Sequence, residues 1–530
     1  MLPPPANEEV RSAEVIGALC LATDLGMGLP LEHGLRSTMI AMRLAERLGL
    51  DEDESRQAFY GCLLFYVGCT ADAETEASLF PPGALGQHFT PVMFGSPRET
   101  MQGILRALAN PDSAAPVRLL QGVVRLPRAG RSHGAHLDAM CEVAEMLCDD
   151  LGMPAGVRHL FGNLTARWDG RGPTSKLRGE RIPVALRVIH VARDAAFHQL
   201  VRGTDAAAQV IRRRSGHAFD PAVVGALVGD PAGVLSEDDA GSVWEATLAL
   251  EPPPWLTIGP DGLDRALAAM GRFAELLATC FHGHAAAVSD LAGSAAAGLG
   301  LSAEEVIRVR RCGFVHDLGR VAVSCATWTK PSALTADEWE QVRLHPYYTG
   351  RVLGRSAVLA SLAPDAASHH ERLDGSGYHR GTTAAAQPMT ARILAVADAY
   401  CTLTAARPHR AALAPPEAGA ALGEAAGAGV LDTDAVSAVL AAAGQPVPPI
   451  SRPAGLTARE AQVLAMVARG LLTKQVATRL GISPKTADRH LQNAYAKAGV
   501  STRAAAAVFA MKHGLTDWGE LPIPPESRRP

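Results

Sequence analysis

The sequence lacks several features that would mark a secreted or membrane protein. Its nine cysteines are scattered and form no CxxC pair, which argues against a zinc ribbon and a disulfide framework and fits a reducing compartment. It has no charge-free apolar run of about 18 residues, the length of a membrane span. Its first residues, MLPPPANEEV, lack the basic and apolar regions of a signal peptide. We expect a cytoplasmic protein without a membrane segment.

Aromatic and charged residues are also few. They make up 5% and 20% of the 530 residues, whereas 48% are hydrophobic. This composition is typical of packed globular domains rather than disorder, and the length suits about three domains. Alanine-rich, aromatic-poor stretches favour helices over sheets, so we expect an all-α protein.

Charge is distributed unevenly along the chain. Residues 452–530 contain 12 lysines and arginines against 5 aspartates and glutamates, a balance of +7. The whole chain carries −4, so the preceding residues carry −11. A basic tail on an acidic body indicates where a polyanion would bind.

Two distant segments share a pattern that indicates an internal duplication. Residues 167–172 read RWDGRG and residues 372–377 read RLDGSG. In each case an arginine that opens an apolar helical run, Arg187 or Arg392, follows 20 residues after the first arginine. Such repeats are sought before a fold is assigned.

The duplication extends upstream, where histidines precede similar alanine-rich helices. His33 lies 32 residues before Phe65, and His284 lies 32 residues before His316. Both segments show helical periodicity and few strand signals, so we expect two helical bundles. The predicted division is copy 1 over residues 12–229, copy 2 over 236–443, a proline-rich linker over 445–455 and a tail domain over 456–515.

The tail domain has the start and stop signals of consecutive short helices. Thr457 and Glu460 have the spacing of a capping box at the start of the first helix. A second helix is predicted over about 473–480 with Gly481 as its stop, and a third begins at Pro484. A short turn between two helices, the second polar on its free face, suits insertion into a major groove.

The third tail helix has two faces. Ala487, Leu491, Ala494, Tyr495 and Ala498 lie on a stripe that we expect to pack inward. Basic side chains on the outer face suit phosphates or base edges, and an amide suits a base. An amphipathic helix that merely faces water is the alternative. The residues expected to contact DNA are Lys474, Lys485, Thr486, Asp488, Arg489 and Gln492.

The whole tail pattern, LTARE…ARG…KQVATRLGISPKT…H…AYAKAGVSTRAAAAVFAMKHGL, resembles the LuxR-type helix-turn-helix family over residues 456–515. The resemblance implies a four-helix domain that binds double-stranded DNA. The fourth helix, about 503–513 here, often supports dimerisation in that family, so we expect a homodimer. Asp488 stands at a position that is often basic in the family, which bears on base preference.

Copy 2 concentrates side chains of the metal-ligand type. Imidazoles and carboxylates on separate helices of a bundle can converge on two divalent ions. Two ions activate a water and stabilise a departing oxygen, which suits phosphate ester hydrolysis. A single histidine is more often an ordinary packed or surface residue, but the adjacent pairs favour a site. The candidate ligands are His284, His316, Asp317, His345, His369, His370 and Asp398.

The order of these residues resembles the HD-GYP branch of the HD phosphohydrolase superfamily over about residues 280–443. HDLGR resembles the motif HD-x-G-K, and HHERLDGSGYHRG resembles HHE-x-x-DG-x-GYP. Members are metal-dependent phosphodiesterases that act on cyclic dinucleotides, with iron or manganese as the usual metals. The resemblance implies that the candidate ligands bind two such ions and that His316, Asp317 and Arg320 are catalytic.

Three positions depart from that family pattern. Arg320 replaces the usual phosphate-contacting lysine and keeps the charge with a different geometry. His379 replaces the proline of GYP, which changes a loop thought to serve substrate or partner contacts. Cys280 stands where members with a third metal carry a glutamate, which favours a two-metal site.

Copy 1 has lost the ligand residues. Phe65-Tyr66 stands at the place of His316-Asp317, and an aromatic pair cannot bind a hard divalent ion. Leu164-Thr165 stands near the place of the double histidine, and Arg193-Asp194 surrounds the place of Asp398. We expect copy 1, His33 included, to have a structural, dimerising or ligand-sensing role.

The predicted protein is all-α, with two tandem HD-type helical bundles followed by a LuxR-type four-helix domain. One hypothesis is a regulator whose copy 2 senses a metal-bound nucleotide and adjusts DNA binding. A second is a working phosphohydrolase with the helix-turn-helix as an accessory module. A third makes both copies oligomerisation scaffolds, against which the clustered histidines count.

Overall fold

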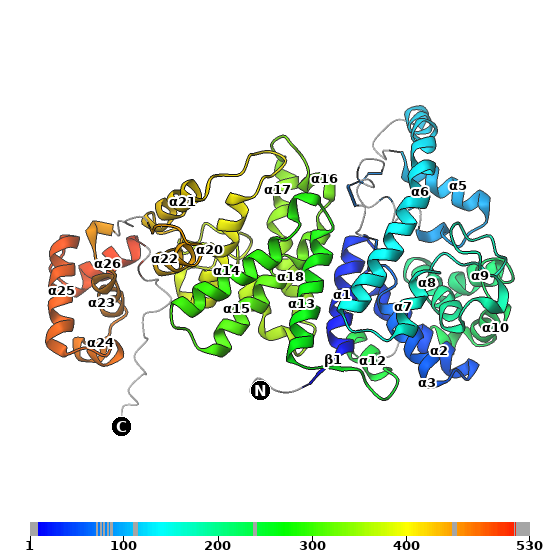
Figure 1. Ribbon diagram of the computed structural model, residues 1–530, viewed down its shortest axis with the longest axis horizontal. Helices are drawn as coiled ribbons and strands as arrows, with labels where there is room; N and C mark the ends of the chain where they lie inside the picture. The colour runs from blue at the N-terminus through cyan, green and yellow to red at the C-terminus, as the bar shows by residue number, and fades with distance from the viewer. Residues whose placement is uncertain are drawn as a thin grey trace, which may run out of the picture. The chain divides into compact units, whose positions relative to one another are not determined.

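The computed structural model describes residues 9–69, 90–109, 115–236, 241–447 and 453–513, with Leu515 and scattered residues between 73 and 88. Contacts divide the chain into two compact units, Met1–Ala285 with Asp317–Ala363, and Ala286–His316 with Pro364–Pro530. Among the described residues one short sheet is present, in which β1 (Val10–Arg11) pairs antiparallel with β2 (Thr257–Ile258) (Figure 1). The remaining regular structure there is helical, which confirms the all-α prediction.

The first unit contains copy 1 and the middle of copy 2. Its 3-10 helices are η2 (Thr90–Val92), η3 (Gly179–Arg181), η4 (Thr279–Phe281), η5 (Leu318–Ala322) and η6 (Leu359–Ser361). Its α-helices are α1 (Ser12–Gly26), α2 (His33–Leu48), α3 (Glu52–Leu63), α5 (Pro97–Ala107), α6 (Ala115–Asp150), α7 (Ala155–Phe161), α8 (Val184–Arg202), α9 (Thr204–Arg214), α10 (Pro221–Gly229), α11 (Pro231–Val234), α12 (Val243–Ala249), α13 (Pro260–Glu275), α16 (Cys325–Trp328), α17 (Ala336–Arg343) and α18 (His345–Leu353).

The second unit contains the rest of copy 2 and the tail. Helices α14 (His284–Gly298) and α19 (Ala363–Ala366) begin at the last residues of the first unit. The 3-10 helices are η7 (Ala384–Ala386) and η8 (Pro453–Gly455). The other helices are α15 (Ala303–Val315), α20 (Met389–Thr404), α21 (Pro415–Gly427), α22 (Thr433–Ala442), α23 (Ala458–Ala468), α24 (Thr473–Arg479), α25 (Pro484–Ala498) and α26 (Arg503–Lys512).

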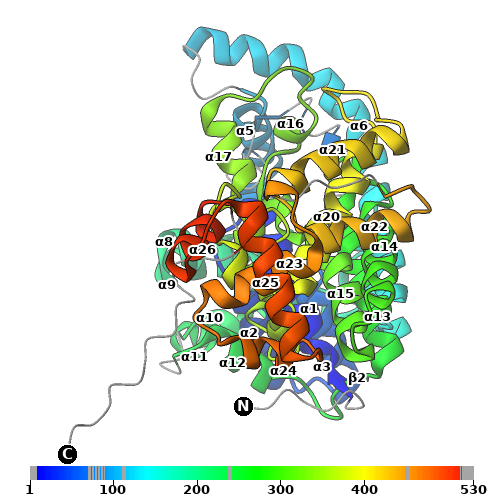
Figure 2. The same ribbon diagram turned by 90° about the vertical axis from the view of Figure 1, so that its left-hand side faces the viewer.

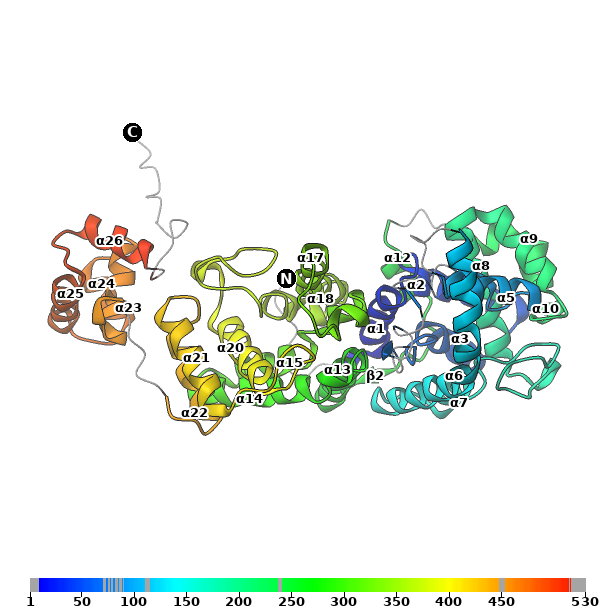
Figure 3. The same cartoon turned by 90° about the horizontal axis from the view of Figure 1, so that it is seen from above.

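One buried helix organises each unit. In the first unit α8 packs against α2, α3 and α9, and Figure 3 shows α8 beside α9. Apolar residues such as Val188, Ile189 and Val191 are fully buried on it, which is typical of a helix covered on most sides. In the second unit α20 contacts α15, α21 and α22 (Figure 2). No helix in the described ranges has the length and apolarity needed to cross a membrane.

The two buried helices are anchored in the same way. Arg187 near the start of α8 donates to Asp220, 2.6 Å away, and Arg392 near the start of α20 donates to Asp432, 3.0 Å away. Each aspartate is the N-cap of the helix that follows it, α10 or α22. Because both arginines belong to the repeated pattern, this shared ion pair supports the duplication.

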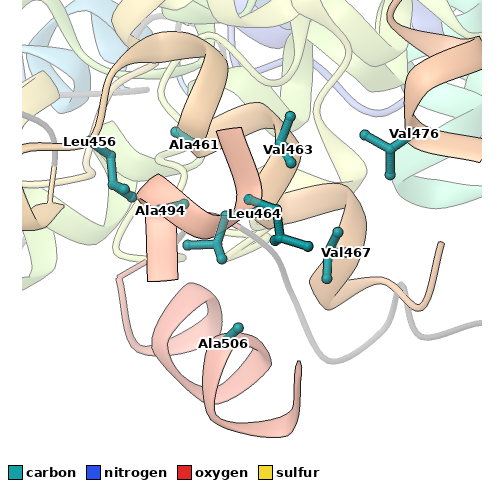
Figure 4. Close-up of a cluster of buried hydrophobic side chains, with 9 residues drawn as sticks. Leu456, Ala461, Val463, Leu464, Val467, Val476, Ala494 and Ala506 are labelled. Atoms are coloured by element: carbon teal, nitrogen blue, oxygen red, sulfur yellow. The ribbon is translucent and has the colours of Figure 1, made fainter. Parts of the chain in front are cut away.

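The tail forms four helices, as its sequence predicts. Thr457 and Glu460 form the expected capping box at the start of α23, and α25 begins at Pro484. Helix α23 packs against α25 and α26, and α24 packs against α25. Figure 4 shows the apolar core between them. Its buried residues are Leu456, Ala461, Val463, Leu464, Val467, Val476, Leu491, Ala494 and Ala506.

Truncation of the tail core is expected to loosen the four helices. Leu464 is fully buried, so Leu464→Ala should destabilise the domain by about 2–5 kcal/mol through lost packing. Hydrogen exchange of the full chain should show faster exchange in α23 and α25. Leu472→Ala is the control, because Leu472 is 61% exposed. Equal protection in both variants would contradict this packing.

Candidate metal centre and nucleic-acid interface

Asp317 is the centre of the histidine cluster in the first unit. It is the N-cap residue of η5 and is 5% exposed. One of its carboxylate oxygens lies 3.4 Å from Nε2 of His284, and the other lies 3.2 Å from Nε2 of His345. A carboxylate between two imidazole nitrogens is a donor set suited to a divalent transition metal.

The loop that carries Asp317 is held tightly against α18. A Cβ on Gly319 would lie 2.0 Å from the carbonyl oxygen of His345, so the backbones approach more closely than a side chain allows. The amide of Gly319 also donates to the Thr349 hydroxyl, 2.9 Å away. The glycine of the HDLG motif therefore sets the distance between Asp317 and His345.

Arg320 has a buried, fixed position beside the cluster. Its guanidinium lies 2.6 Å from Asp317 and 4.3 Å from the ring centre of Phe281. The ring of Trp328 also faces the Arg320 guanidinium, and the indole N–H of Trp328 donates to the Arg320 carbonyl. A lysine would lack this planar stacking, so the aromatic neighbours account for the arginine at this position.

The second unit gathers the other candidate ligands. Asp398 lies within α20, and its two oxygens lie 3.7 Å from Nε2 of His316 and 3.7 Å from Nδ1 of His370. The rings of His316 and His369 meet edge to face at 4.8 Å. The Thr402 hydroxyl donates to Asp398 from one turn further along the helix.

Three of the histidines are oriented by the same local hydrogen bond. Nδ1 of His316, His345 and His369 each faces the carbonyl of the residue three positions earlier, at 2.8, 2.6 and 2.6 Å. A protonated Nδ1 leaves Nε2 as the lone-pair nitrogen of each ring. Fixing the tautomer through the far nitrogen is how proteins prepare histidine ligands for a metal.

Each unit carries its own ligand-type side chains among the described residues. The first unit holds His284, Asp317 and His345, and the second holds His316, His369, His370 and Asp398. All except His370 are buried. Buried imidazoles and carboxylates fit divalent metal ions.

Sequence reasoning gave no role to Glu371, the third residue of HHE. It is buried, and its carboxylate accepts hydrogen bonds from the amides of Arg380 and Thr382. It therefore holds the loop that contains His379 against the double histidine. The HHE motif was the available signal for this residue.

In copy 1 a guanidinium occupies the equivalent region. Arg193, which corresponds to Asp398 in the repeat, lies over the rings of Phe65 and Tyr66 at 4.8 and 4.2 Å. It is buried and donates to the carbonyl of Cys62 and to Nδ1 of His33. The guanidinium of Arg193 and the rings of Phe65 and Tyr66 therefore occupy this region of copy 1.

His33 and Asp24 show how strongly that region is desolvated. Burial lowers the pKa of His33, and the Arg193 guanidinium lowers it further, so the ring is neutral. Burial also raises the pKa of Asp24 to about 7, against the opposing effect of Arg193. Nε2 of His33 donates to the Arg193 carbonyl, 3.1 Å away, which agrees with the structural role predicted for this histidine.

The structure places most of the predicted DNA-contacting residues on the surface of α24 and α25. Thr486 differs, because it is half-buried and its hydroxyl is hydrogen-bonded to Ser483, the N-cap of α25. Arg479, at the end of α24, is an exposed basic residue that sequence reasoning did not select. The exposed predicted residues are Lys474, Lys485, Asp488, Arg489 and Gln492.

An ion pair connects α25 to the first turn of α23. Lys497 donates to Glu460 at 2.6 Å and to the Gly455 carbonyl. Burial alone raises the pKa of Glu460, but the hydrogen bonds from Lys497 and Thr457 outweigh it and lower the pKa to about 2. Lys497 is therefore engaged in the fold and is not counted among the DNA-facing residues.

Comparison with known families finds two matching segments. Residues 270–434 match the HD domain family, and residues 454–510 match the family described as bacterial regulatory proteins, luxR family. The chain thus contains an HD domain and a LuxR-type helix-turn-helix domain.

Its curated relatives are HD-type cyclic nucleotide phosphodiesterases. The 3'3'-cGAMP-specific phosphodiesterase 3 of Vibrio cholerae serotype O1 is 28% identical over 405 residues, 76% of this chain and 88% of that protein. The cyclic di-GMP phosphodiesterase response regulator RpfG of Xanthomonas campestris pv. campestris is 40% identical over 127 residues, 24% of this chain and 34% of RpfG.

A solved structure shares the fold. The crystal structure of the cyclic GMP-AMP specific phosphodiesterase V-cGAP3 of V. cholerae superimposes with a TM-score of 0.56 at 24% identity. It covers 82% of this chain and 98% of that one.

Removal of the copy 1 cation is expected to destabilise the first unit. Arg193→Met leaves the Cys62 carbonyl and the buried Asp24 without their cation, which should cost about 3 kcal/mol or more. Calorimetry of the full chain would show a lowered transition for this variant. Arg202→Met is the matched control, because Arg202 is exposed at the end of α8. An unchanged transition for Arg193→Met would contradict the assigned role.

Proposed function

We propose that this protein is a DNA-binding transcriptional regulator whose HD domain binds divalent metal and hydrolyses a phosphodiester of the cyclic dinucleotide class. The observation that carries the proposal is that each unit holds an aspartate close to two imidazoles: Asp317 lies between His284 and His345, and Asp398 lies between His316 and His370. A scaffold would gain nothing from these residues, because buried imidazoles and carboxylates are costly unless they are paired or bind metal. We propose that the protein acts in the cytoplasm, where its DNA target lies, and as a homodimer.

The proposed metal ligands are His284, Asp317 and His345 of the first unit and His316, His369, His370 and Asp398 of the second. Two divalent ions, such as iron or manganese, would supply an activated water and stabilise the leaving oxygen of the ester. The ester oxygen–phosphorus bond breaks, water adds to phosphorus, and a cyclic dinucleotide becomes linear.

The chain's own residues would then orient the reacting groups. The hydrogen bonds at Nδ1 keep the three rings from rotating, which preserves a fixed ligand geometry. Arg320 would place a positive charge beside Asp317 for an anionic substrate. Glu371 would hold the loop that covers the double histidine.

Support for the substrate class comes from the relatives. Their names assign them 3'3'-cGAMP or cyclic di-GMP as substrates. The second candidate function is sensing without turnover. The ion pair of Arg320 with Asp317 favours it, because a guanidinium bound to a ligand carboxylate competes with a metal for the same oxygen.

Metal content tests the proposed ligands. Elemental analysis of purified protein should find about two divalent ions per wild-type chain, and Asp317→Asn should lose most of them because Asp317 lies between two histidines. His284→Ala has a matched control in His282→Ala, since His282 is exposed two residues earlier. Metal retained by Asp317→Asn and His284→Ala alike would exclude the assigned ligands.

Release of linear dinucleotide from 3'3'-cGAMP and cyclic di-GMP then separates the two candidate functions. Turnover that disappears in Asp317→Asn supports the hydrolase. Metal and nucleotide binding without turnover would establish the sensor instead.

DNA binding depends on the exposed face of α25. Arg489→Ala should weaken binding to duplex DNA about tenfold and reduce the salt slope by about one unit, because one cation no longer meets the duplex. Fluorescence anisotropy on duplexes enriched from genomic DNA measures both quantities. Lys512→Ala is the control, because it removes one exposed positive charge from α26 instead of α25. An equal loss in both variants would show that net charge, not the α25 face, determines binding.

A further inference from the structure

Copy 1 contains a cavity that the metal centre of copy 2 does not explain. Its volume is about 790 Å³, within the range of small-molecule sites. It lies against the loop of residues 167–172, the counterpart of the loop that follows the double histidine in copy 2. The cavity has an apolar wall and a basic wall.

The apolar wall comes from residues of copy 1 that lie between α3 and α7. It consists of Phe94, of Met101 and Ile104 on α5, and of Leu137 on α6. Met101 is 45% exposed, which is a large apolar side chain facing open space. A ligand with an apolar body would cover this surface.

The basic wall carries more positive charge than its neighbours neutralise. Arg214 is bound by Asp194 at 2.5 Å, and Arg167 lies 3.4 Å from Asp169. No described residue forms an ion pair with Arg171 or Arg213, which also line the cavity.

The acidic residue on that wall, Glu99, is shared between two sets of partners. Its carboxylate accepts hydrogen bonds from the amide and hydroxyl of Ser96 in the capping box of α5. The Ser96 amide lowers the pKa of Glu99 most, and the charges of Arg214 and Arg213 on α9 lower it further. Arg171 on the loop and Arg213 on α9 both line the cavity, and Arg171 has no ion-pair partner among the described residues. Guanidiniums bind phosphate oxygens through paired hydrogen bonds.

Local contacts fix the backbone of the loop that carries Arg171. The Asp169 carboxylate accepts the Arg171 amide at 3.0 Å, Gly170 has a φ of 75°, and a Cβ on Gly172 would lie 2.3 Å from the Thr165 carbonyl. These features fix the turn but do not require an arginine at its tip.

The corresponding loop of copy 2 has the same turn, with Ser376 in place of Arg171. Asp374 accepts the Ser376 amide at 3.0 Å, and Gly375 has a φ of 78°. The repeat therefore conserves the frame within this chain and places serine in copy 2 where copy 1 has Arg171. An arginine on a fixed turn beside a cavity is a recognition feature rather than a folding requirement.

We propose that this cavity in copy 1 binds a nucleotide, with Arg171 and Arg213 on its phosphates and the wall of Met101, Ile104 and Leu137 against its base. The described residues of copy 1 include no group of metal-ligand side chains, so we propose that the nucleotide is bound and released unchanged. The site is a nucleotide sensor separate from the metal centre, and it does not depend on the function proposed for copy 2.

Calorimetric titration of the full chain tests this site. The probes are GMP, GTP, cyclic di-GMP and 3'3'-cGAMP, with inorganic phosphate and benzoate for comparison. The chain carries Asp317→Asn to remove turnover in copy 2. At least one nucleotide should bind, and more tightly than inorganic phosphate, because the apolar wall contacts its base.

Substitutions within copy 1 locate the binding. Arg171→Ser, which installs the copy 2 residue, and Arg213→Ala should each weaken nucleotide binding about tenfold or more. Met101→Glu should abolish it by placing a carboxylate on the apolar wall. Arg212→Ala is the matched control, because Arg212 precedes Arg213 on α9, is exposed and lies outside the cavity lining.

Three results would overturn the proposal. They are no binding of any nucleotide by the folded chain, binding that is unchanged in the Arg171→Ser/Arg213→Ala double variant, and a preference for benzoate over all nucleotides. The substituted positions of copy 1 are exposed arginines except Met101, and circular dichroism of each variant, all in the Asp317→Asn background, checks that the comparison is between folded proteins.

Discussion

The candidate metal centre depends on one hydrogen bond that the fold makes three times. In His316, His345 and His369, Nδ1 faces a carbonyl one turn earlier, which fixes the ring and leaves Nε2 as the ligand nitrogen. Without that bond each ring could rotate about its side-chain torsions, and Nε2 would no longer point in a fixed direction. The close approach of Gly319 to α18 acts in the same direction, because it sets the position of Asp317. The chemistry therefore rests on backbone carbonyls as much as on the ligands.

The duplication separates what the fold requires from what the chemistry requires. Both copies keep the aspartate–glycine turn and the arginine paired with a helix-capping aspartate. Apart from His33, the counterpart of His284, the ligand positions differ, since copy 1 has a guanidinium stacked on two aromatic rings where copy 2 has imidazoles and carboxylates. A buried positive charge at Arg193 satisfies this region without a metal. Copy 1 thus retains the framework and is free to serve another ligand.

Sequence reasoning reached the helical fold, the four tail helices and their capping because these follow local rules. The Thr457–Glu460 box and the start of α25 at Pro484 need only a few neighbouring residues. It also collected the metal-ligand candidates, since their spacing resembles a known family. It could not reach Glu371 as the anchor of a loop, the stacking of Arg320 on Phe281, or the cavity beside Arg171. Those features depend on residues that are distant in sequence and meet only after folding. Thr486 was predicted at the DNA surface, and its hydroxyl is shared with the helix cap.

The central claim is that the buried histidines and aspartates of copy 2 bind a divalent transition metal. X-ray absorption at the metal edge of the purified full-length chain measures the ligand shell directly. Nitrogen and oxygen scatterers are expected at roughly 2.0–2.2 Å, the distances of imidazole and carboxylate ligands, with the outer-shell pattern of imidazole that is absent in Asp317→Asn. A shell of sulfur scatterers, or a protein that binds no metal when supplied with iron or manganese, would contradict it.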